Sequence, residues 1–145
     1  MKGAQESAEE MLALLERRVW LPQGLGKDQG ATHEMLKQQV ANLSEVLDCP
    51  CELEWPIAYE DRAGRIDVVF FRKPHLSSLA WPSHAFEIDY NPKRKSIVKL
   101  QTLPDTCQKW IVAFSPRVKP IKLRETLRAG INVYRVRRES HPYEP

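Results

Sequence analysis

Acidic residues interrupt two apolar segments of the chain, and they are the clearest sign of chemistry in the sequence. Asp67 lies within the run RIDVVFF, and Glu87 and Asp89 lie within AFEIDY. An ionised carboxylate is costly to bury unless it is paired or binds a metal. If the two segments form neighbouring strands, Asp67 stands across from Glu87, and their converging oxygens suit Mg²⁺ or Mn²⁺. In the alternative interpretation, Asp67 pairs with Arg65 on its own strand and Glu87 faces solvent.

Three strands are expected to position these acids. Residues 51–57 alternate in polarity, and β-branched and aromatic side chains dominate residues 65–71 and 85–90, which is typical of strands. A polar turn joins the first two strands as a hairpin. Because side chains alternate along a strand, Glu87 and Asp89 should share one face of the third strand.

Helices and two further strands complete the expected fold. Apolar side chains recur at helical spacing in the N-terminal part, while proline and glycine mark helix ends in the C-terminal part. Thr32 and Ser96 are expected to cap the second and third helices. A meander followed by helical crossovers predicts an α/β fold with a central mixed sheet of about five strands, flanked by helices. The expected helices span 8–20, 32–47, 96–103 and 120–129, and the two further strands span 110–114 and 131–136.

The composition bounds the class of protein. With 145 residues, 42% apolar and 28% charged, the chain has the makeup of one globular domain. No apolar run approaches the ~18 residues of a membrane span. The acidic N-terminus lacks a secretory signal and three cysteines fit a reducing compartment, so we expect a cytoplasmic protein without membrane contact. We divide it into an N-terminal helix with a flexible linker (1–30), a main domain (31–138) and a tail (139–145); helix 8–20 is the segment expected to mediate any homodimer.

Positive charge concentrates in the C-terminal half. Residues 1–90 contain nine Lys or Arg and fifteen Asp or Glu, a balance of −6, whereas residues 91–138 contain thirteen and two, a balance of +11. This separation favours a nucleic-acid partner, and the alternative is a solvated cationic face. No base-reading motif is evident, which favours recognition of the backbone. The expected contacts are Lys93, Arg94, Lys95, Arg117, Lys119, Lys122, Arg124 and Arg128.

The motifs resemble those of the PD-(D/E)XK nuclease superfamily, which has the restriction-endonuclease-like fold. Gly64-Arg65-Ile66-Asp67 is similar to the first motif and Phe86-Glu87-Ile88-Asp89 to the second, followed by a helix and a buried strand. The resemblance spans about Thr32 to Val136, which is most of the chain. It implies a divalent metal held by the two motif acids and by the backbone carbonyl of the residue that follows the second acid. The implied metal ligands are Asp67, Glu87 and Ile88.

The chain departs from this family at Asp89, which stands where the motif usually has a lysine. In some members the following helix supplies the basic group, and Lys99 is the preferred substitute, with Lys95 second. The resemblance also makes Glu34 a candidate to orient water. Asp89 would add a ligand or hold a water.

The resemblance implies metal-assisted hydrolysis of DNA phosphodiester bonds, in junction resolution, repair or restriction. One alternative is a catalytically inactive relative that binds nucleic acid or a protein partner, and another is a structural adaptor. Motifs for Ser-His-Asp or Cys-His catalysis and for a Walker-type phosphate loop are not evident.

Overall fold

A computed structural model describes residues 7–22, 28–72 and 81–138. Its centre is a mixed sheet in the order β2-β3-β4-β5-β6, in which β2, β3 and β4 are antiparallel and β4, β5 and β6 are parallel. This confirms the predicted α/β fold. The expected linker around residues 23–27, the loop at 73–80 and the tail at 139–145 lie outside the described residues. The strands are β2 Cys51–Tyr59, β3 Arg62–Phe70, β4 His84–Asp89, β5 Gln108–Ala113 and β6 Asn132–Arg135.

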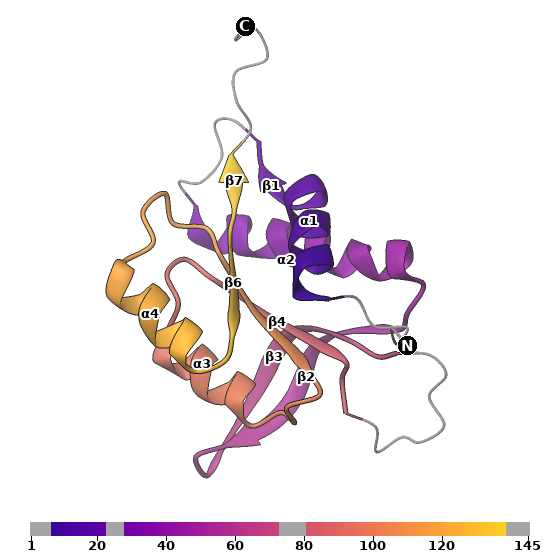
Figure 1. Ribbon diagram of the computed structural model, residues 1–145, viewed down its shortest axis with the longest axis vertical. Helices are drawn as coiled ribbons and strands as arrows, with labels where there is room; N and C mark the ends of the chain where they lie inside the picture. Colours follow the sequence, from indigo (N-terminus) through magenta and orange to yellow (C-terminus); the bar gives the residue numbers. More distant parts are fainter. Residues whose placement is uncertain (1–6, 23–27, 73–80, 139–145) are drawn as a thin grey trace, which may run out of the picture.

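Helices cover both faces of the sheet (Figure 1). Helices α1 (Ala8–Arg18) and α2 (Gln29–Leu47) pack on one face, and α3 (Arg94–Gln101) and α4 (Pro120–Arg128) lie on the other. In the described part of the chain, no helix combines the length and apolar character needed to cross a membrane. The sheet therefore has a separate apolar core on each side.

Alternation along β4 distributes its side chains between the two cores. Phe86 and Ile88 join the cluster beneath α1 and α2, whereas Ala85 joins the cluster beneath α3. Every residue of β4 is buried. Glu87 and Asp89 contact side chains of α3 and so lie on the same face as Ala85. This confirms the prediction, from the alternation of side chains along a strand, that the two acids share one face.

Two helix starts differ from the sequence prediction. Asp28, not Thr32, caps α2, because its carboxylate accepts the N–H of Ala31 at 3.1 Å. Thr32 lies inside the helix, and its hydroxyl donates to the carbonyl of Asp28. Helix α3 likewise begins before Ser96, whose hydroxyl donates to Asp89 at 3.0 Å.

The N-terminal segment is joined to the C-terminal part of the domain. Strand β1 (Trp20–Leu21) pairs in parallel with β7 (Arg137–Arg138), and the hydroxyl of Tyr134 donates to the carbonyl of Val19. Met11 and Leu15 of α1 are fully buried in the core shared with α2. The apolar side of the helix expected to mediate any homodimer is thus buried inside the protein's own core.

Candidate functional site

The carboxylates of Asp67 and Glu87 lie side by side where the regular pairing of β3 and β4 stops. The Cα pairing reaches Val68 and Phe86 and goes no further toward these two acids. Instead, the N–H of Asp67 donates to Oε2 of Glu87 at 2.9 Å, and the N–H of Ile88 donates to Oδ2 of Asp67 at 2.8 Å. Each carboxylate thus accepts a backbone N–H from the other strand at the point where the regular pairing has ended.

A local distortion of the hairpin places Asp67 at this junction. Ile66 packs in the cluster beneath α3, whereas Val68 packs in the cluster beneath α2, so β3 changes face at the residue between them. On β2, Glu54 falls between Leu53, which pairs with Val68, and Trp55, which pairs with Ile66; its φ of 53° is left-handed. The register is the same on both sides of this point, so no residue is inserted, and the change of face coincides with the left-handed backbone of Glu54.

Lys99 of α3 occupies the buried side of the site. Its Nζ lies 2.7 Å from Oε1 of Glu87 and donates to the carbonyl of Arg65 at 2.7 Å. Gly64 makes room for this arrangement, because a Cβ there would lie 2.6 Å from the ring of Tyr59 and 3.4 Å from Cδ of Lys99. The glycine of the first motif therefore has a packing role beside the lysine.

The second lysine candidate lies elsewhere. Lys95 is exposed, although it precedes Lys99 by four residues on the same helix. Four residues advance a helix by more than one full turn, so the two side chains differ in direction by roughly 40°. The structure brings Lys99 to the acids, and it leaves Lys95 in solvent.

The surroundings of Glu87 disfavour the ionised form of its carboxyl group. The side chain is 3% exposed. Burial, followed by the negative charge of Asp67, raises the pKa of Glu87 to about 7, and the ammonium of Lys99 opposes this rise. A cation placed between the two carboxylates would favour the ionised form of both, which is the condition that a divalent metal site requires.

His33 approaches Asp67 from the other side of the sheet, and the sequence analysis did not identify it. Its Nε2 lies 3.3 Å from Oδ2 of Asp67, and its side chain is 30% exposed. The hydrogen bond to Asp67 raises the pKa of His33, while burial opposes this. The available signal was its position in the first turns of α2, one residue before the Glu34 already under consideration.

Glu34 does not reach the two acids directly. Its carboxylate lies 2.9 Å from Nζ of Lys37 and 3.5 Å from Nδ1 of His33, and its side chain is largely exposed. Lys37 also donates to Glu54 on β2 at 2.9 Å. Glu34 therefore connects to Asp67 through His33, and it helps to fix the histidine ring.

Asp89 serves to hold α3. Its Oδ1 accepts the hydroxyl of Ser96 at 3.0 Å, and its Oδ2 accepts the N–H of Lys93 at 3.2 Å. Burial raises its pKa, and these hydrogen bonds oppose the rise. Since both oxygens bind the first turns of the helix that carries Lys99, Asp89 helps to orient that helix.

The donor set is suited to a hard cation but is small. Among residues 7–22, 28–72 and 81–138, no three His, Cys, Asp or Glu side chains form a group that could hold a metal ion. A cation here would have to take its oxygens from the carboxylates of Asp67 and Glu87, a backbone carbonyl such as that of Ile88, and water. Mg²⁺, which commonly keeps several waters, is compatible with such a set.

The predicted basic contacts gather on the two helices that share one face of the sheet. Arg94 lines a groove of about 540 Å³ between α3 and α4, together with Lys122 and Arg128. Two of these cations already have acidic partners: Arg94 lies 2.8 Å from Glu60 and Lys122 lies 3.6 Å from Glu125. The other predicted contacts flank or belong to the same helices, and all of them are exposed: Lys93, Lys95, Arg117, Lys119 and Arg124.

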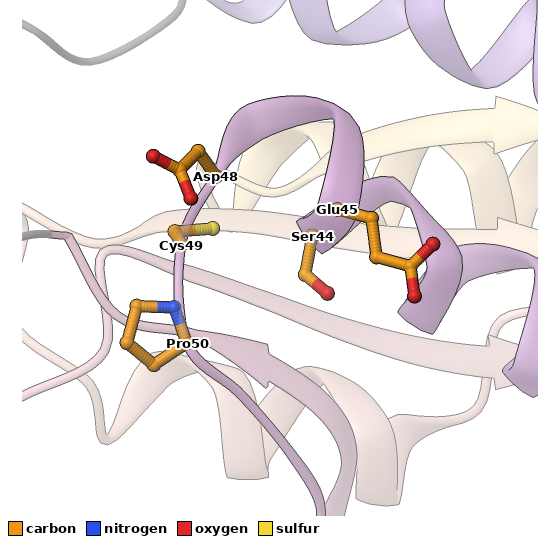
Figure 2. A pocket seen from close by; sticks show the side chains of 5 residues that line it. All are labelled: Ser44, Glu45, Asp48, Cys49 and Pro50. Carbon is orange, nitrogen blue, oxygen red and sulfur yellow. The ribbon is translucent and has the colours of Figure 1, made fainter.

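A second hollow, of about 350 Å³, lies at the C-terminal end of α2, away from His33 in the first turns of that helix. Figure 2 shows the carboxylates of Glu45 and Asp48 pointing in different directions, so they do not converge on a ligand. Burial raises the pKa of the neighbouring Cys51, which disfavours a reactive thiolate. The lining residues are Ser44, Glu45, Asp48, Cys49 and Pro50.

Comparisons with known proteins leave the family open. No protein-family model matches the chain, and neither the curated proteins nor the solved structures give a significant match. The structure establishes a mixed α/β domain, and the resemblance to the PD-(D/E)XK nucleases stays a prediction.

Proposed function

We propose that this chain is a metal-dependent nuclease that hydrolyses phosphodiester bonds of DNA, with a restriction-endonuclease-like domain. The supporting observation is the meeting of Asp67 and Glu87 on adjacent strands, with Nζ of Lys99 2.7 Å from Glu87. Two acids that can share a cation, with a lysine beside them, suit metal-assisted hydrolysis of a phosphodiester. DNA is the expected partner, Mg²⁺ or Mn²⁺ the expected cofactor, and the cytoplasm the expected location.

Lys99 would take the role of the motif lysine that the chain lacks. Asp89 occupies that lysine's place in the sequence, but the side chain of Lys99 enters from α3 and contacts the motif glutamate. Its ammonium would steady negative charge developing on a phosphate oxygen. A bound Mg²⁺ would lower the pKa of a water and offset charge on the phosphoryl group. His33, 3.3 Å from Asp67, would orient that carboxylate or a water beside it.

The basic helices support nucleic acid as the substrate. The exposed cations of α3 begin directly after the strand that carries Glu87, so a phosphate backbone bound there would pass beside the acids. Each phosphate contact releases counterions, and binding should therefore weaken steeply as salt increases.

The decisive experiment removes the two acids while keeping their shape. Asp67→Asn and Glu87→Gln should reduce Mn²⁺-dependent cleavage of duplex, single-stranded and branched DNA to the level seen with a chelator, because the amides bind a cation poorly. Asp61→Asn, at an exposed position in the hairpin turn, is the matched control and should cut normally. Cleavage that persists in both site variants at native fold would disprove the assignment.

A second candidate function is a catalytically inactive domain that binds nucleic acid or a protein partner. It is favoured by the hydrogen bonds and the ion pair that already occupy Asp67 and Glu87, and by the small donor set among the described residues. Salt-sensitive DNA binding without cleavage in Mn²⁺ would support this function over the first.

A further inference from the structure

A large aromatic side chain is exposed next to the hairpin of β2 and β3. Trp81 is 53% exposed, although burying a tryptophan is among the largest apolar gains available to a protein. Its ring contacts Trp55 edge-on, with centroids 6.1 Å apart and planes at 68°. Trp55 in turn contacts Phe71 in the same manner at 6.2 Å. The inner rings thus support the outermost one, which remains open to a ligand.

The ring that supports Trp81 belongs to a residue close to Asp67 in the sheet. Trp55 pairs across the hairpin with Ile66, the residue before Asp67. It packs against the cluster beneath α3, on the face from which Lys99 contacts Glu87. The exposed ring of Trp81 is therefore on the same side of the sheet as the buried lysine.

We propose that Trp81, supported by Trp55, stacks an unpaired nucleobase of the nucleic acid, so that single-stranded or branched substrates are preferred to plain duplex. This inference rests on the proposed function and names its substrate class. In a duplex each base is stacked on both faces, whereas an unpaired base has a free π-face for an aromatic side chain. The Lys and Arg side chains of residues 91–138, where the charge balance is +11, would bind the phosphates of the strand at the same time.

Other exposed apolar residues do not offer this chemistry. Ile121 and Leu127 of α4 are 56% and 54% exposed, but an aliphatic side chain has no π-face for stacking on a base. Ile121 therefore provides a matched control, since its exposure is close to that of Trp81 and it lies on a different element.

The test compares two oligonucleotides of equal charge. Binding of the full chain to fluorescent oligothymidine and to an abasic oligonucleotide of the same length is measured in chelator, so that no cleavage occurs. Trp81→Ala should weaken oligothymidine binding by about 5- to 150-fold, the range that corresponds to loss of one stacked base, and leave abasic binding unchanged. Ile121→Ala should change neither, and Trp81→Phe should retain most of the preference for bases.

Equal loss on both oligonucleotides, or no loss on either, would overturn the stacking role. If Trp81→Ala fails to fold, Trp81→Leu serves as the variant without a ring and is compared with Trp81→Phe, which keeps one. Because the assay contains no metal, its result is separate from catalysis. A base-selective loss in a protein that never cuts DNA would leave the stacking role standing and remove the nuclease activity.

Discussion

The two faces of β4 bury titratable side chains in opposite ways. On the face beneath α1 and α2, the ring of His84 lies 6.0 Å from that of Phe70, and burial, followed by the charge of Arg72, lowers the pKa of His84 to about 4. On the face beneath α3, Glu87 has Lys99 as its partner, while burial raises the pKa of Glu87 to about 7. The first face thus favours a neutral ring, and the second holds a pair of charges that chemistry could use.

The two groups therefore predict opposite responses of stability to pH. The raised pKa of Glu87 means that its contribution is fully present below its ordinary pKa of 4.5 and is lost as pH rises through about 7. The lowered pKa of His84 means that its contribution is present above 6.5 and is lost as pH falls toward 4.

The largest effect is expected at the paired face. Lys99→Met should reduce the free energy of unfolding by about 3–5 kcal/mol at pH 8, because it leaves Glu87 buried without a counter-charge. The loss should shrink at pH 5, where Glu87 takes up a proton. Urea unfolding at the two pH values measures both quantities.

Two variants sharpen this result. Lys95→Met, at an exposed position one turn earlier, should change stability by no more than about 0.5 kcal/mol. Lys99→Met combined with Glu87→Gln should recover much of the loss at pH 8. A Lys99→Met penalty that is the same at both pH values would break the comparison, since the cost would then come from packing alone.

A somewhat smaller effect is expected at the neutral face. Between pH 7 and 4 the wild type should lose on the order of 3 kcal/mol more stability than His84→Gln, because each unit of pKa change is worth about 1.4 kcal/mol. Unfolding curves for both proteins across this range give the difference. Parallel pH profiles would mean that His84 accepts a proton without opposing the fold.

The smallest effect is expected at His33, which is partly open to solvent. His33→Asn should change the free energy of unfolding by less than about 1 kcal/mol, with the larger difference at low pH, because the raised pKa of His33 stabilises the fold when the ring is charged. Gln38→Asn, on the exposed side of α2, is the control. A penalty as large as that of Lys99→Met would place the essential support of the acids on α2 instead of α3.

The sequence predicted the sheet and the face of Glu87 because both follow from local alternation. The same reasoning could not predict the change of face at Asp67, which coincides with a left-handed backbone at Glu54 on the neighbouring strand. The contact of His33 with Asp67 depends on how α2 packs on the sheet, and no spacing in the sequence encodes it.

The roles of the helix residues were predicted in part. Lys99 reaches Glu87, while Lys95 points to solvent, because four residues exceed one helical turn. Ser96 was expected to cap α3, but the carboxylate of Asp89 makes the bonds to its first turns. A sequence shows that both residues are polar, and packing decides which of them accepts the bonds.

The bond between Tyr134 and Val19 joins residues 115 positions apart, close to the pairing of β1 with β7. Contacts of such long range slow folding, because a large loop must close before they form. During synthesis, α1 would therefore leave the ribosome with its apolar side uncovered and dock fully only after β6 emerges. Conditions that stall translation late in the chain should expose that helix to chaperones or to aggregation.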